Sequence, residues 1–270
     1  MVRPPAVAGR FYPSESGELA RQIDLFCSSR AAGETRTRAL GCVVPHAGYL
    51  YSGHVAGAVY SSMEIPERCV LLGPRHFPQG QPLAILTEGS FATPFGEAPI
   101  DSALAADLAR SDPILREDPV AHQREHSLEV QIPFLQRLVH DFRFVPLVLA
   151  SDRYGVLEEL GRAVARTVKA CPDRVLVIAS SDMNHYENDA ITRAKDSRAI
   201  ERVLALDPRG LYDVVRNEGI SMCGYGATTA LLVAVLELGA KQTKLIRYAT
   251  SGDVTGDLDQ VVGYAGIVIS

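Results

Sequence analysis

The sequence predicts a three-layer α/β fold in which helices cover both faces of a central sheet. Apolar runs of strand length recur along the 270 residues, and stretches with helical spacing lie between many of them. Several of these runs, such as VLVIA at 175–179, are apolar on both faces, which is typical of strands in the middle of a covered sheet. We therefore expect a single domain that spans residues 1–270.

Seven stretches predict strands because each contains a short apolar run of the length that suits a buried strand. Examples are CVV at 42–44 and VLL at 70–72. In chain order the predicted strands occupy residues 41–46, 68–76, 82–88, 142–150, 174–182, 244–251 and 261–270. The order of the strands in the sheet does not follow from one sequence.

Six stretches predict helices because their apolar residues recur three to four positions apart and so fall on one helix face. An example is YGVLEELGRAVARTVKA at 154–170. In chain order the predicted helices occupy residues 15–29, 101–111, 126–140, 154–170, 196–207 and 227–240.

Composition and charge limit the classes of protein to which the chain can belong. Apolar residues make up 47% and charged residues 22%, as in ordinary globular proteins with a sizeable core. The net charge of −5 argues against a nonspecific nucleic-acid-binding protein, which needs a basic surface. The sequence contains no run of about 18 uncharged apolar residues, so we expect no membrane span. The five cysteines contain no CxxC pair, and the N-terminus lacks the apolar core of a signal peptide, so we expect a cytoplasmic protein.

Three histidines follow predicted strands that lie far apart in the sequence. His46 ends GCVVPH, His76 follows VLLGPR, and His185 follows VLVIASSDMN. Ligands of open α/β sheets bind beyond the carboxyl ends of the strands, so three imidazoles in such positions can converge on one site. For any one of them, a hydrogen bond to a neighbouring backbone group is an equally good interpretation. The coincidence of three favours a shared site.

Cys223 stands in SMCGYGATTALL, just before glycines and a strongly apolar predicted helix. A helix N-terminus stabilises negative charge and therefore favours a thiolate, which is both a metal ligand and a nucleophile. The alternative is a buried thiol at a place where glycines let the helix pack closely. The residues alone leave both interpretations open.

Two further motifs carry polar groups of interest. His126 and Glu129 in REHSLEVQIPFL are three residues apart and share a helix face, where they can support the site or bind substrate. Alternatively, this motif is only the capped start of a helix. Asp182 precedes His185 by three residues and can orient its imidazole as a general base. Its alternative role is to bind backbone amides in the turn.

The motifs together resemble the Memo family, whose bacterial and archaeal members are also called AmmeMemoRadiSam system protein B. The segments that carry the resemblance occur in the family's order and are RPPAVAGRFYP, VVPHAGYLYSGH, LLGPRH, EHSLEVQIPFL, SSDMNHY and MCGYGA. They run from residue 3 to about residue 230. Six ordered motifs make this resemblance far more specific than any single histidine.

The family is similar in fold to class III extradiol dioxygenases, so the resemblance implies a central mixed sheet with helices on both faces. Those enzymes hold iron(II) with two histidines and a carboxylate. By resemblance, His46 and His76 fall on the metal-binding histidines, and Cys223 falls where the dioxygenases have their glutamate. His185 falls on their acid–base histidine, with Asp182 beside it.

Three functions are compatible with the resemblance. The first is a redox or oxygenase-type enzyme of unknown substrate, with Fe(II) as the expected metal and Cu or Zn as alternatives. Tyr49, Tyr51 and the pair His126 and Glu129 are then expected to line its pocket. The second is a protein that handles copper or iron without turnover, because a thiolate is softer than a carboxylate.

The third function is a phosphopeptide- or ligand-binding module that uses the same cleft, in which Arg75 of GPRH pairs with a phosphate. The family name further implies a radical-SAM enzyme and an AMMECR-type protein as partners. We expect no nucleic acid or membrane partner.

Overall fold

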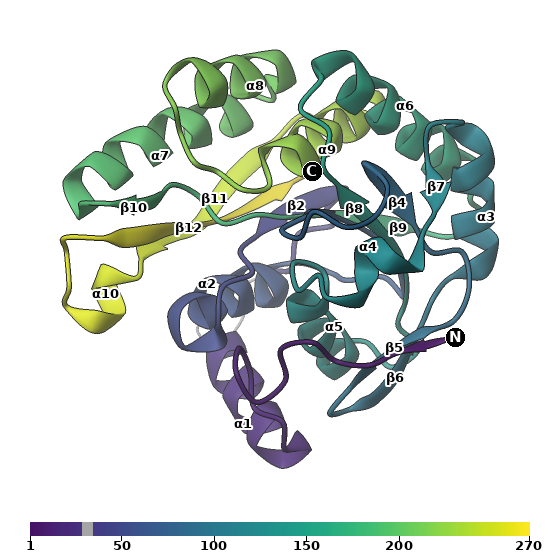
Figure 1. Ribbon diagram of the computed structural model, residues 1–270, viewed down its shortest axis with the longest axis horizontal. Helices are drawn as coiled ribbons and strands as arrows, with labels where there is room; N and C mark the ends of the chain where they lie inside the picture. The colour runs from purple at the N-terminus through teal and green to yellow at the C-terminus, as the bar shows by residue number, and fades with distance from the viewer. Residues whose placement is uncertain (29–34) are drawn as a thin grey trace.

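The computed structural model describes residues 1–28 and 35–270 and confirms the predicted three-layer α/β architecture. A central sheet lies between two layers of helices (Figure 1). Its nine strands are β2 (Gly41–Val44), β3 (Arg68–Pro74), β4 (Leu83–Ile85), β7 (Arg116–Glu117), β8 (Arg143–Leu149), β9 (Val175–Ser180), β10 (His185–Glu187), β11 (Thr243–Thr250) and β12 (Val261–Ile269).

Four parallel strands form the centre of the sheet, in the order β2, β9, β3 and β8. They are almost entirely apolar and buried, as strands covered by helices on both sides must be. Antiparallel strands flank this centre, with β12 beside β2 and β4 beside β8. The sheet is therefore mixed. The carboxyl ends of β2, β9 and β3 lie next to one another at one edge of the sheet.

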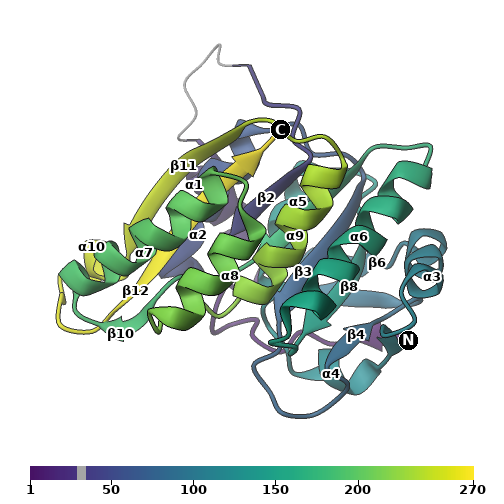
Figure 2. The same cartoon turned by 90° about the horizontal axis from the view of Figure 1, so that it is seen from above.

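The helices form a layer on each face of the sheet. One layer contains α1 (Ser16–Cys27), α2 (Tyr49–Ser62) and α5 (Ile132–Leu138). The other contains α3 (Ser102–Ser111), α6 (Tyr154–Ala170), α7 (Asp189–Leu204), α8 (Pro208–Asn217) and α9 (Tyr225–Glu237), seen in front of the sheet in Figure 2. Shorter elements are α4 (Pro119–Gln123), η1 (Glu129–Gln131) and α10 (Gly252–Thr255). A separate small sheet consists of β1 (Val2–Arg3), β5 (Ser90–Thr93) and β6 (Gly96–Pro99).

Close packing of α9 positions the segment that carries Cys223. Helix α9 lies against α6 and against strands β9 and β3. A Cβ atom on Gly161 of α6 would lie 2.5 Å from the carbonyl oxygen of Ala230, so only glycine permits this approach. A Cβ atom on Gly224 would likewise lie 2.5 Å from the carbonyl oxygen of Ser180. The loop before α9 therefore rests directly on the end of β9.

Two helices differ from the sequence prediction in their bounds. The predicted helix at 126–140 is a 3₁₀ turn followed by α5, which has a proline in its first turn and leaves residues 126–128 in a loop. The predicted helix at 196–207 begins earlier, where the side chain of Asn188 caps α7 by accepting a hydrogen bond from Ile191 N. The predictions at the other four helices and at the seven strands are confirmed to within a few residues, except that the predicted end of the first helix, at residue 29, lies outside the described residues.

Helix α2 was not among the predicted helices. Its sequence, YLYSGHVAGAVYSS, is apolar around most of its circumference, and ten of its residues are buried. Such a helix shows no apolar stripe, so periodicity does not reveal it. In the part of the chain that the structure describes, no helix is both long enough and apolar enough to cross a membrane.

Candidate metal centre

A cavity of about 590 Å³ lies at the carboxyl ends of the central strands. Its lining includes six polar side chains from distant parts of the chain, namely His46, His76, His126, Asp182, His185 and Cys223. Phe11, Tyr186 and Tyr264 contribute aromatic surface. The structure thus brings the three predicted strand-end histidines and Cys223 to one cavity.

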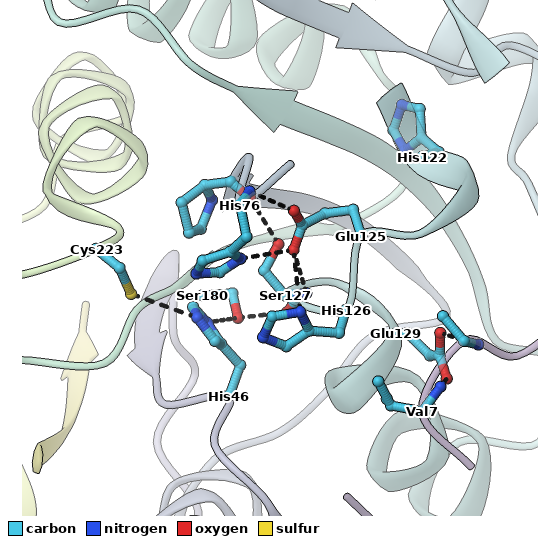
Figure 3. Close-up of polar contacts among 12 residues, drawn as sticks. Val7, His46, His76, His122, Glu125, His126, Ser127, Glu129, Ser180 and Cys223 are labelled. Atoms are coloured by element: carbon cyan, nitrogen blue, oxygen red, sulfur yellow. Dashed lines mark hydrogen bonds and ion pairs between the residues drawn. The ribbon is translucent and has the colours of Figure 1, made fainter. Parts of the chain in front are cut away.

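His46 is held at the end of β2 by contacts to β9. Its backbone N–H donates to Oδ1 of Asp182 at 2.7 Å, which ties the two strand ends together. Its ring is buried, with Nδ1 at 2.9 Å from Oγ of Ser180 and Nε2 at 3.3 Å from Sγ of Cys223 (Figure 3). Burial holds the pKa of His46 well below its usual value, and the neighbouring His76 lowers it further. The imidazole is therefore neutral at pH 7 and has the charge state of a metal ligand.

His76 follows β3 and is oriented by Glu125. Its Nδ1 atom lies 2.8 Å from Oε1 of Glu125, and its backbone N–H donates to Oε2 of the same carboxylate (Figure 3). The backbone N–H of Ser127 donates to Oε1 as well. Burial opposes ionisation of Glu125, but its hydrogen bonds with His76 lower the pKa of this carboxyl to about 2. A carboxylate that fixes the ring orientation of a histidine in this way is typical of metal sites.

Cys223 is half-buried, and its surroundings favour the neutral thiol, one of the two interpretations that the sequence left open. Burial raises the pKa of the Cys223 thiol well above its usual value, and the charge of Asp182 raises it further. The N-terminus of α9, which begins at Tyr225, does not offset these effects. Ionisation of this thiol therefore needs a cation beside it, as metal binding would provide.

The three side chains fit a metal ion. The ligand atoms of His46, His76 and Cys223 all lie within 4.8 Å of one another. Metal–nitrogen bonds of about 2.1 Å and metal–sulfur bonds of about 2.3 Å, at angles near 100–110°, separate the two donor atoms by about 3.4–3.6 Å. The observed separation of 3.3 Å between His46 Nε2 and Cys223 Sγ is close to this range. A second group, His76 with Glu125 and His126, meets the same distance limit but shares His76.

His185 and Asp182 both line the cavity, but they have different hydrogen-bond partners. Nδ1 of His185 lies 2.9 Å from the carbonyl oxygen of Ser221, an acceptor only, so this nitrogen carries a proton. Asp182 accepts hydrogen bonds from the backbone N–H groups of His46 and Ala47. Ser221, not Asp182, therefore orients the imidazole of His185. Burial raises the pKa of Asp182 despite these bonds.

His126 lies in the cavity wall, whereas Glu129 of the same motif does not. The ring of His126 stacks on that of His76, with centroids 4.5 Å apart. Glu129 is fully buried and accepts hydrogen bonds from the N-terminal segment, including one from Nη1 of Arg3 at 2.6 Å. Figure 3 shows Glu129 turned away from the three histidines, towards Val7. Glu129 therefore holds the N-terminal segment in place through these hydrogen bonds.

Three other predicted site residues lie outside the cavity lining. Tyr49 is buried, and its hydroxyl donates to the carbonyl oxygen of Val130. Tyr51 packs against a small apolar cluster formed by Val55, Ala249 and Tyr264. Arg75 donates to the carbonyl oxygens of Gly80 and Gln81. The structure therefore does not bring these three side chains to the candidate metal ligands.

The sequence prediction missed several residues that shape the site. Glu125 directly precedes His126 in REHS, but nothing in the sequence links it to His76, which is 49 positions away. Ser221 lies two residues before Cys223 and was not predicted to take part in the site. Phe11 belongs to the N-terminal motif RFYP and packs edge-on against His126, with ring centroids 5.0 Å apart.

The fold and the site define an α/β protein with a candidate metal centre at the carboxyl ends of parallel strands. This chain belongs to the Memo family, because the family's sequence model, described as Memo-like protein, matches residues 3–268. The architecture is the central mixed sheet with helices on both faces that the sequence resemblance implied.

Individual relatives agree with this membership. The chain is 42% identical to a MEMO1 family protein from Methanopyrus kandleri, with 99% of each chain covered. It is 40% identical to a MEMO1 family protein from Thermotoga petrophila, with 100% of each covered. An uncharacterized protein from Escherichia coli K12 superposes with a TM-score of 0.58 at 12% identity, covering 86% of this chain and 100% of the other. This last likeness shows the fold alone.

Proposed function

We propose that the protein binds one divalent metal ion through His46, His76 and Cys223 and uses it in a redox or oxygenase-type reaction on a small substrate. The observation that carries the proposal is the convergence of three ligand atoms, from distant segments, within 4.8 Å at the wall of one cavity. Iron(II) is the metal we expect first, with copper and zinc as alternatives. Three protein ligands leave positions on a metal open, as catalytic sites require.

The protein's own residues would bind the metal, shield it and move a proton. When bound, the metal supplies Lewis-acid and redox chemistry. Glu125 holds His76 in position, and the burial of His46 keeps water from its ring. His185 faces the same cavity with Nδ1 held by Ser221, so its Nε2 atom is the one that can accept or release a proton.

Cys223 supports a second candidate, a metal-handling protein without turnover. A thiolate is a soft ligand and favours copper(I) over hard cations. Such a protein would bind copper(I) tightly and would consume no oxygen when loaded. The phosphopeptide alternative has less support, because Arg75 donates to two backbone carbonyls outside the cavity.

Metal reconstitution tests the proposal. Metal-free protein is loaded anaerobically with iron(II), copper(I) or zinc, and bound metal is measured by mass spectrometry. We expect one metal per chain in the wild type and none in Cys223→Ser or His76→Ala. Matched controls are Cys27→Ser and His140→Ala, whose side chains lie outside the cavity and should leave loading unchanged.

The outcomes separate the candidates. Oxygen consumption by the iron-loaded protein supports the oxygenase-type function, whereas preference for copper(I) without oxygen consumption supports metal handling. Failure of every metal to bind stoichiometrically contradicts both.

We also propose the radical-SAM and AMMECR-type partners that the family name implies, and a cytoplasmic location. Both proposals rest on the sequence alone, and the partners rest only on its resemblance to the family. Co-purification of the tagged chain from its own cells tests the partners, and recovery of neither protein would contradict them.

A further inference from the structure

A buried chain of hydrogen bonds runs from α2 to His46. The hydroxyl of Tyr60 donates to Oε1 of Gln131 at 2.8 Å. Nε2 of Gln131 donates to Oγ of Ser180 at 2.8 Å and to the carbonyl oxygen of Pro45 at 2.8 Å. Oγ of Ser180 lies 2.6 Å from the carbonyl oxygen of Ser127 and 2.9 Å from Nδ1 of His46. All four side chains are at most 1% exposed.

Two backbone carbonyls determine where the protons of this chain lie. A carbonyl oxygen can only accept, so the group of Gln131 that faces the Pro45 carbonyl must be its amide nitrogen. For the same reason, the single hydroxyl proton of Ser180 must point to the Ser127 carbonyl. Ser180 has no second proton to donate.

Oγ of Ser180 can therefore only accept from its two remaining neighbours, the amide of Gln131 and Nδ1 of His46. Nδ1 of His46 must then carry the imidazole proton, which leaves Nε2 with a free lone pair. That lone pair belongs to the atom 3.3 Å from Sγ of Cys223.

We propose that Ser180 is a positioning residue that keeps His46 in the Nδ1-protonated tautomer and so presents Nε2 as a metal ligand. The link to a metal rests on the proposed function, whereas the tautomer does not. The other histidine ligand is oriented differently, because a carboxylate, that of Glu125, accepts from Nδ1 of His76. For His46, the acceptor at Nδ1 is the neutral hydroxyl of Ser180. This hydroxyl can only accept there, because the carbonyl of Ser127 engages its single proton.

The tautomer is directly measurable in metal-free protein. Nitrogen-15 NMR of labelled histidine distinguishes a protonated ring nitrogen from an unprotonated one. Near neutral pH we expect His46 to show a protonated Nδ1 and an unprotonated Nε2 in the wild type and in Tyr60→Phe, since the Pro45 carbonyl alone orients Gln131. Ser180→Ala should lose this preference and show a mixture of the two tautomers.

Metal affinity provides the second readout. Loss of a group that orients a metal ligand typically weakens binding 10–100-fold, so we expect a fall of about that size in Ser180→Ala. The matched control is Ser61→Ala, which removes a buried hydroxyl that, among the described residues, bonds only within α2. It should leave both the tautomer and the affinity unchanged.

The outcomes distinguish this inference from the proposed function. A protonated Nε2 in the wild type overturns the inference, even if a metal binds and even if Ser180→Ala does not fold. Unchanged metal affinity in folded Ser180→Ala overturns the positioning role. Wild-type protein with the expected tautomer but without stoichiometric metal contradicts the proposed function and leaves the tautomer assignment supported.

Discussion

Nδ1 of His76 lies 2.8 Å from Oε1 of Glu125, and the same carboxylate accepts the backbone N–H of His76 through Oε2. Glu125 is almost completely buried, so no solvent competes with these bonds. One carboxylate thus holds both the ring and the backbone of a candidate metal ligand. The arrangement leads to a prediction about metal affinity.

We expect Glu125→Gln to weaken metal binding by about 10–100-fold, the usual cost of losing a group that orients a ligand. The amide can still accept from Nδ1 of His76, but its NH₂ group then faces the backbone N–H of the same residue. Loss of the charge also removes the main group that raises the pKa of His76 against the effect of burial, beside Asp182, and so makes this imidazole a less basic ligand. A competition assay with a metal chelator measures the affinity. Glu88→Gln, at an exposed position, is the control, and equal affinity in the two variants would refute the prediction.

His185 lines the cavity but lies outside the group of ligand atoms that converge within 4.8 Å. We therefore expect His185→Ala to retain one metal per chain, because three other side chains supply the ligands. Mass spectrometry of the reconstituted variant gives the stoichiometry. A loss of metal comparable with that of His76→Ala would show that His185 is a ligand and that the site has four protein donors.

The central sheet was predictable because its strands are apolar on both faces. Strands β3 and β9, for example, have the short apolar runs that only a covered sheet can bury. Helix α2 was not predictable by the same reasoning, because a helix buried on most sides has no periodic pattern. The strand order also needed the structure, since the pairing of β2 with β9 joins segments more than 130 residues apart.

The site was predictable where one rule of sheet architecture applied. His46 and His76 follow parallel strands whose carboxyl ends share an edge of the sheet, so their convergence follows from position alone. Glu129 and Tyr49 show the limit of local spacing. Neither motif reveals which neighbour a side chain faces, and the structure directs Glu129 to Arg3 and Tyr49 to the core.

Tyr186 stands at the cavity with a backbone φ of 61°, in the left-handed region that bulky residues rarely adopt. We expect Tyr186→Gly to be more stable than Tyr186→Ala by about 1 kcal/mol, because glycine adopts this φ without strain. Both variants lose the same exposed ring, so their difference isolates the backbone effect. Urea unfolding measures the two free energies of unfolding. Greater stability of the alanine variant would show that the backbone at this position is relaxed.

Asp196 on α7 predicts a pH dependence of stability. It is fully buried, and burial raises the pKa of this carboxyl to about 7 despite hydrogen bonds from Tyr248 and from the backbone of Asn184. Below about pH 4 both the folded and unfolded chains carry the proton. As the pH rises from about 4 to 7 the unfolded chain releases it first, so the free energy of unfolding falls, by about 4 kcal/mol at most for this group. Above the folded-state pKa of about 7, both the folded and unfolded chains have released the proton. The stabilisation by protonated Asp196 is then lost, and this group no longer makes the free energy of unfolding depend on pH.

Asp196→Asn should remove this part of the pH dependence, because the amide does not titrate. The amide oxygen of the variant can still accept from Tyr248, but its NH₂ group then faces the backbone N–H of Asn184. We therefore expect the variant to be less stable than the wild type at pH 5. Between pH 5 and pH 8 its free energy of unfolding should then fall less than that of the wild type. Urea unfolding at both pH values measures the two slopes, with Asp213→Asn as the control at an exposed ion pair. Parallel slopes in wild type and Asp196→Asn would mean that Asp196 is ionised in the folded protein throughout this range, because its two hydrogen bonds then outweigh its burial.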